Sequence, residues 1–146
     1  MNNNEVISIL DGLIQTCKRG RDVFRGAAES IQNSEFRRLF NIFSQQRVQF
    51  IKELDAEAAR LGGDGDIEAT GELPSNTLPF RTATKPAVRD ESGIIAECQH
   101  EEETAVNDYQ EALKGDLPLD VQYVVKRQYM DIKDAYDRIR ILQRAA

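Results

Sequence analysis

The sequence has little of the residues that carry most protein chemistry. It holds one histidine, two cysteines and no tryptophan among 146 residues. A di-iron bundle needs two Glu-x-x-His motifs, so a single histidine excludes a complete set. Cys17 and Cys98 lie far apart and form no CxxC pair, which argues against a thiol redox motif or a disulfide framework. We therefore expect a reduced protein that is stabilised by its core.

Positive charge is also in deficit. The chain has 19 basic against 25 acidic residues, and its formal net charge is −6. Binding to nucleic acid requires a clustered basic face that neutralises phosphates, and binding to anionic membrane surfaces has the same requirement. We therefore predict no nucleic-acid partner and no membrane partner.

A long apolar run and a basic N-terminal segment are missing as well. Met1 to Glu5 contains no basic residue, and Asp11 and Gln15 interrupt the apolar residues that follow. This pattern fits neither a signal peptide nor a membrane span. We expect a cytoplasmic protein.

What the chain does have is helical periodicity. From Val6 to Ile31 the inward residues recur at alternating steps of four and three, as in helical bundles. Similar stripes appear three more times, so helices are predicted over about 3–32, 34–61, 90–114 and 118–143. Asn2 and Glu5 have the spacing of a capping box, and we expect Asn33 to end the first helix and Ser34 to cap the second.

A proline- and glycine-containing segment, 64–89, separates the second and third helices. Such a long connection between two helical hairpins is the topology of ferritin-like bundles. The sequence therefore predicts one all-α domain over 1–146, a ferritin-like antiparallel four-helix bundle with an irregular crossover at 64–89.

Charged residues interrupt the apolar stripes near the midpoints of the helices. Antiparallel pairing about turns near Asn33-Ser34 and near Asp116 brings Gly20 opposite Arg47 and Glu102 close to Gln128. A buried charge is tolerated when it is paired, so we expect Arg47, Glu102 and Gln128 to form a central polar layer. Gly20 would leave room for the arginine.

Other interpretations of this layer remain open. Tyr129 or Tyr136 could complete its hydrogen bonds, or Arg47 and Glu102 could reach the surface instead. The layer could also hold a metal ion, or a small ligand in a cavity near Gly20.

Several stretches resemble a bacterial family of ferritin-like four-helix-bundle proteins whose function is unknown. The stretches are Phe43-Ser44-Gln45-Gln46-Arg47, Ala96-Glu97-Cys98 with Glu102 and Tyr109, and Arg127-Gln128-Tyr129 with Asp137-Arg138-Ile139-Arg140. The resemblance implies the bundle fold and implies no activity. Tyr136 stands where members of that family often carry histidine, which weakens any metal role in this chain.

One Glu-x-x-His match does occur, at Glu97 to His100. At about 100° per residue, His100 points away from the face that carries Glu102, so we predict that it lies on the surface. The alternative function is therefore a metal-binding oxidase or storage protein with a non-standard iron or manganese site. Its candidate ligands are Glu102, Gln128, Gln46 and Tyr136.

No catalytic or cofactor-binding residue is predicted. We interpret the chain as a non-enzymatic bundle protein that acts by self-association or by binding a protein partner, and we expect a homo-oligomer. Five apolar residues off the main stripes are expected to be exposed and are candidates for the interface: Ile14, Ile42, Val48, Ile51 and Ile141.

Overall fold

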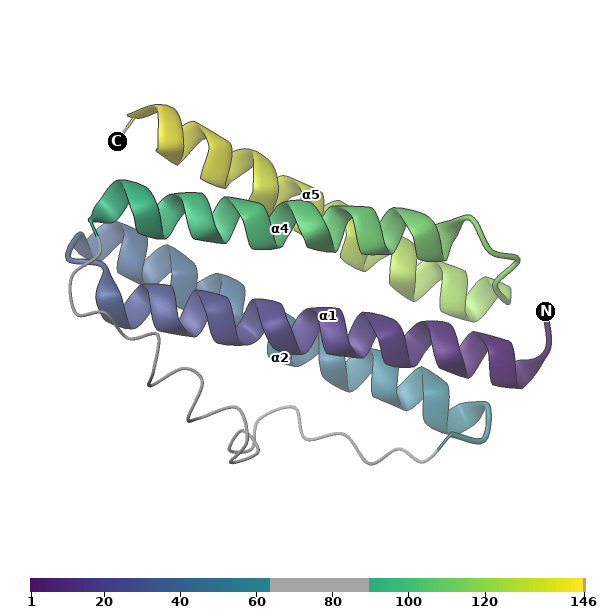
Figure 1. Ribbon diagram of the computed structural model, residues 1–146. Coiled ribbons are helices and arrows are strands. Elements are labelled where there is room, and N and C mark those ends of the chain that lie inside the picture. The colour runs from purple at the N-terminus through teal and green to yellow at the C-terminus, as the bar shows by residue number, and fades with distance from the viewer. Residues whose placement is uncertain (64–89, 146) are drawn as a thin grey trace.

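The computed structural model describes residues 1–63 and 90–145. The predicted crossover at 64–89 lies outside the described residues. Within them the chain is all-α and forms the four helices labelled in Figure 1, namely α1 (Asn3–Ser30), α2 (Ser34–Arg60), α4 (Glu91–Leu113) and α5 (Leu119–Ala145). Each helix begins and ends within two residues of its predicted ends. None of the described helices is long and apolar enough to cross a membrane.

Side-chain caps fix where the first two helices start. Asn2 Oδ1 accepts from the Glu5 amide and Asn2 N donates to Glu5 Oε1, both at 2.8 Å, which confirms the capping box. The expected roles of Asn33 and Ser34 were wrong. Asn33 itself caps α2, because its backbone is extended and its Oδ1 accepts from the amides of Glu35 and Phe36.

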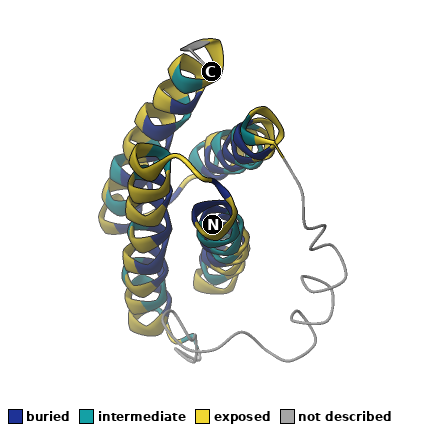
Figure 2. Cartoon of the chain, turned by 90° about the vertical axis from the view of Figure 1, so that its left-hand side faces the viewer, coloured by how far each residue is buried: buried dark blue, intermediate teal, exposed yellow. Residues whose placement is uncertain are grey.

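The helices form two antiparallel hairpins, α1 with α2 and α4 with α5 (Figure 1). The hairpins pack together mainly through α1 and α4, while α2 and α5 meet over a smaller area. α4 begins at the end of the bundle where α1 turns into α2, and α2 ends at the opposite end (Figure 1). Buried residues face the space between the helices, as Figure 2 shows.

The core consists of two apolar clusters. One includes Leu10, Ile51 and Tyr109, and lies toward the end where α4 turns into α5. The other is rich in phenylalanine and lies toward the turn between α1 and α2, where Phe24 packs on Phe40 and Phe43 with ring centroids 6.0 and 5.4 Å apart.

The α1–α2 interface is wider than the sequence indicated. Ile14, Val48 and Ile51 were expected to be exposed, and this was wrong, because all three are buried in the first cluster. A single heptad stripe is too narrow to describe a helix with neighbours on two sides. Ile42 and Ile141 are exposed as expected, by 54% and 61%.

Candidate functional site

The candidate site lies at the centre of the bundle, around Arg47 of α2. The Arg47 side chain is 1% exposed, although it is one of the longest in the chain. Gly20 of α1 faces it, and a Cβ atom added there would lie 3.2 Å from Arg47 Nε and 3.5 Å from its Cγ. The absence of a side chain at Gly20 therefore makes room for the arginine, as the sequence suggested.

The Arg47 guanidinium is held from several sides. Its Nη2 donates to Glu102 Oε1 of α4. Its Nη1 donates to Oε1 of Gln46, the preceding residue on α2. Its Cζ lies 5.4 Å from the centre of the Phe24 ring and 5.7 Å from that of Phe50, within cation–π range. The buried cation therefore has an anionic partner, a neutral acceptor and two aromatic faces.

Glu102 is the anionic member of this pair, and it is fully buried. Its Oε1 accepts from Arg47, while no described residue donates a hydrogen bond to its Oε2. Burial raises the pKa of the Glu102 carboxyl, and the Arg47 charge and hydrogen bond oppose this effect without cancelling it. The ion pair thus carries a desolvation cost, as expected for charges removed from water.

A second group of polar residues centres on Tyr109 of α4. Its hydroxyl donates to Gln128 Oε1 of α5 at 2.7 Å and lies 3.2 Å from Cys17 Sγ of α1. Burial raises the pKa of Tyr109, and it raises the pKa of the Cys17 thiol to about 11. Both groups are therefore neutral near pH 7, and Cys17 lacks the lowered pKa of a reactive thiol.

Gln128 extends this group to α2. Its Nε2 donates to Glu53 Oε1 at 2.9 Å and to the Phe50 carbonyl at 3.3 Å. Arg127 also donates to Glu53 Oε1, at 2.7 Å. Burial tends to raise the pKa of Glu53, but hydrogen bonds from Gln128, Arg127 and Gln49 lower it overall.

The sequence predicted a single central layer of polar residues, but the structure has two neighbouring groups of polar residues. Arg47 and Glu102 meet directly, whereas Gln128 lies level with Tyr109, seven residues further along α4 than Glu102. The prediction placed the α4–α5 turn near Asp116. The contacts between α4 and α5 show that the two helices pair in a different register.

The four candidate metal ligands do not converge. Glu102 and Gln46 each accept from a terminal nitrogen of the Arg47 guanidinium, Nη2 and Nη1, and Gln128 belongs to the Tyr109 group. Tyr136 donates to Glu103 Oε2 at 3.1 Å in an exposed contact between α5 and α4. Neither Tyr136 nor Tyr129, which accepts from Gln110, bonds to the central ion pair.

The donor set does not fit a di-iron centre. Such a centre needs several inward carboxylates and histidines, and Glu102 here faces a guanidinium cation instead. His100 and Glu97 are exposed, so the one Glu-x-x-His match does not reach the centre. Over 1–63 and 90–145, no group of three or more His, Cys, Asp or Glu residues is arranged to hold a metal ion.

Sequence reasoning missed several polar residues in the interior. Thr16 is 3% exposed, and its hydroxyl donates to Asp108 Oδ2 at 2.7 Å across the α1–α4 interface. Arg21 is 2% exposed and its Nε donates to Asp22 Oδ1 at 3.0 Å. Both lie beside the apolar stripe, so a search restricted to the stripe could not find them.

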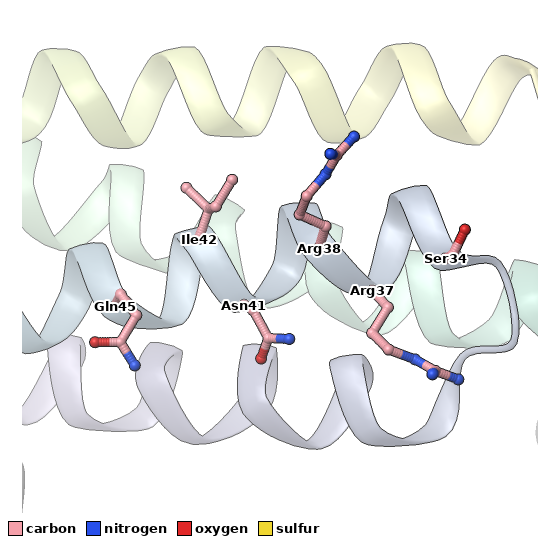
Figure 3. A pocket seen from close by; sticks show the side chains of 6 residues that line it. All are labelled: Ser34, Arg37, Arg38, Asn41, Ile42 and Gln45. Atoms are coloured by element: carbon pink, nitrogen blue, oxygen red, sulfur yellow. The ribbon is translucent and has the colours of Figure 1, made fainter.

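Among the described residues, a shallow depression on the outer face of α2 is another feature that could hold a ligand. It has a volume of about 460 Å³ and is lined by Ser34, Arg37, Arg38, Asn41, Ile42 and Gln45 (Figure 3). Ile42 and Arg38 extend toward α5, while Asn41 and Gln45 extend toward α1. The lining holds no carboxylate, histidine or thiol, so none of the lining residues could act as a general base to activate the Ser34 hydroxyl.

Comparison with known proteins identifies the fold and leaves the activity open. Residues 5–115 match a family model described as "Domain of unknown function (DUF2383)". A solved protein from Anabaena variabilis ATCC 29413, described as a two-domain protein containing DJ-1/ThiJ/PfpI-like and ferritin-like domains, superposes with a TM-score of 0.78 at 16% identity. The match covers 99% of this chain but only 37% of the solved chain. No curated protein sequence matches the chain.

Proposed function

Since the chain belongs to the domain family of unknown function DUF2383 and has a ferritin-like four-helix-bundle fold, we propose that it is a non-enzymatic bundle protein that acts through its outer surface. It would do so by self-association or by binding a protein partner. The Arg47–Glu102 pair would be a structural element that takes the place of a di-iron centre.

The observation that supports this proposal is the buried ion pair between Arg47 and Glu102. A guanidinium beside the inward carboxylate opposes the binding of a metal cation, because like charges at short range repel in a low-dielectric interior. The neighbouring Cys17 and Tyr109 have raised pKa values and are poor nucleophiles and bases near neutral pH. The centre can therefore fix helix register, and the surface is left for function.

The first test is metal analysis of the protein purified without chelator or affinity tag, followed by titration with iron(II) and manganese(II). We expect less than about one tenth of a metal ion per chain, because Glu102, the one fully buried carboxylate among the described residues, is already paired with Arg47. The control is Arg47→Met, which removes the repelling cation and leaves Glu102 in place. Stoichiometric binding to the unmodified protein that Glu102→Gln abolishes would favour the alternative, a metal-dependent oxidase or storage protein.

The solved neighbour favours a second candidate function. In that protein a ferritin-like domain and a DJ-1/ThiJ/PfpI-like domain lie on one chain. We infer that a separate DJ-1/ThiJ/PfpI-like protein from the same genome is a candidate partner of this bundle. Calorimetry with the two purified proteins would test this, and absence of heat at concentrations near 100 μM, which corresponds to a free energy of about −5.5 kcal/mol, would contradict it.

A further inference from the structure

The contact between α2 and α5 is the least extensive among the neighbouring pairs of described helices. Its polar bonds are partly open to solvent. Glu53 Oε1 accepts from Arg127 at 2.7 Å and from Gln128 at 2.9 Å, and the Glu53 and Arg127 side chains are 24 and 40% exposed. Arg60 Nη1 lies 3.8 Å from Asp120 Oδ2, and these side chains are 56 and 77% exposed. Bonds that water can reach open more readily than buried ones.

The contact between α1 and α4, on the other side of the bundle, is built differently. Thr16 of α1 is 3% exposed, and its hydroxyl donates to Asp108 Oδ2 at 2.7 Å. Cys17 and Tyr109 are fully buried, and the Sγ atom of one lies 3.2 Å from the hydroxyl oxygen of the other. The two hairpins are therefore joined firmly along α1 and α4, and weakly along the contact between α2 and α5, which we call the seam.

The seam is not closed over its whole length. Figure 3 shows Ile42 and Arg38 of α2 extending toward α5, yet Ile42 is 54% exposed. This part of α2 is therefore not covered by α5. Further along α2 the two helices do meet, and the Phe50 carbonyl accepts from Gln128 at 3.3 Å. The bonds of Glu53 to α5 follow directly after this point, so Glu53 is placed where the closed part of the seam begins.

The buried centre opposes separation of the hairpins less than an apolar contact would. Arg47 and Glu102 bind each other across the bundle, from α2 to α4, so they part when the seam opens. Both charges then regain water, and the desolvation cost that offsets their attraction is recovered. Glu102 Oε2, to which no described residue donates, also gains hydrogen-bond donors. An unsatisfied buried acceptor is costly in the closed state, and opening removes that cost.

We propose that the two hairpins part along the seam, with the α1–α4 contact as the hinge, and that Glu53 is the residue that holds the seam closed. The open state gives water and small solutes access to the polar centre of the bundle. The bonds of Thr16 to Asp108 and of Cys17 to Tyr109 persist in it, because they lie at the hinge. This motion is a property of the interior and goes beyond the proposed function at the outer surface.

The native cysteines report on this opening, because Cys17 and Cys98 are free thiols that are fully buried. The experiment measures the rate at which a thiol reagent labels the folded full chain at increasing urea, with mass spectrometry to assign each thiol. Urea accelerates an opening in proportion to the surface that the opening exposes. We expect labelling at low urea to be faster than global unfolding allows and to depend only weakly on urea.

Variants locate the opening within the bundle. Glu53→Leu removes the acceptor of Arg127 and Gln128. It should raise the labelling rate by about tenfold or more beyond the effect of its altered global stability. Glu53→Gln keeps an acceptor oxygen and should raise the rate less, and it carries the test if Glu53→Leu does not fold. Thr16→Val is the matched control at the hinge, and its labelling rate should follow its global stability alone.

Two results would overturn the opening along the seam. In the first, the labelling rates of all variants follow the global unfolding constant and show the full urea dependence of unfolding. In the second, Thr16→Val raises the rate as much as Glu53→Leu at equal global stability, which would place the weak contact elsewhere than between α2 and α5. Neither result bears on self-association or partner binding, which involve the outer surface.

Discussion

Arg47 of α2 and Glu102 of α4 form an ion pair in which neither side chain is more than 1% exposed. The two residues are 55 positions apart in sequence, and they join the two helical hairpins at the middle of the bundle. Removing one member of such a pair leaves an uncompensated buried charge, whereas removing both removes the desolvation cost as well.

This relationship predicts the outcome of a double-mutant cycle. Arg47→Met and Glu102→Leu should each lower the free energy of unfolding by about 3–5 kcal/mol. The double variant should lose less than either single variant, since no unpaired charge remains in it. Urea denaturation of the four proteins measures the coupling. Additive losses would show that the pair does not behave as a buried unit.

The Tyr109 hydroxyl should contribute to stability through its bond to Gln128. Tyr109→Phe removes the donor to Gln128 Oε1, which is buried, and should lower the free energy of unfolding by about 1–3 kcal/mol. Tyr129→Phe is the matched control, because the Tyr129 hydroxyl bonds to Gln110 in an exposed contact, and it should change stability by less than about 0.5 kcal/mol. Equal effects in thermal or urea unfolding would contradict the role of the buried group.

Two glycines of α1 should respond differently to alanine. Alanine favours the helix over glycine by about 1 kcal/mol, and nothing lies within 4 Å of a Cβ atom at Gly12. Gly12→Ala should therefore stabilise the protein by about that amount. Gly20→Ala should gain less, because its Cβ lies 3.2 Å from Arg47 Nε. Gly20→Leu should destabilise it by about 1–3 kcal/mol or more through overpacking, and equal gains at the two alanine variants would show that Arg47 does not need the space.

The stability of the protein in acid should depend on Glu53. Its pKa is lower in the folded protein than the ordinary value of 4.5, so the unfolded chain binds a proton more readily. The stabilising contribution of Glu53 is therefore present above pH 4.5 and is lost as the pH falls through the lower, folded value. In urea titrations between pH 6 and pH 3, about the range in which carboxylates titrate, Glu53→Gln should lose less stability than the unmodified protein.

Glu101 should affect the stability of the protein in acid in the opposite direction to Glu53. Burial raises the pKa of Glu101, so the folded protein binds a proton more readily than the unfolded chain, and this gives a gain in stability as the pH falls toward 4.5. Glu101→Gln should remove that gain and steepen the loss in acid. A variant pair with the same pH dependence would contradict both assignments.

The sequence alone determined the fold class of this protein. The periodicity of its apolar residues gave four helices with ends within two residues of those observed, because burial of one face is the dominant local signal in a bundle. The same pattern placed the charged residues Arg47 and Glu102 at inward positions. It also placed Gly20 opposite Arg47, where a larger side chain would meet the arginine. Composition also showed that a complete set of di-iron ligands is absent, because the chain has one histidine.

Only the tertiary structure decided which polar groups meet. The register between α4 and α5 placed Gln128 beside Tyr109 and Glu53 rather than beside Arg47, and register depends on how the turn and both helix faces pack together. The structure likewise buried Ile14, Val48 and Ile51 and left the opposite face of α5 exposed. Helical periodicity tells which residues share a face, but whether a second helix covers that face is a property of the assembled bundle.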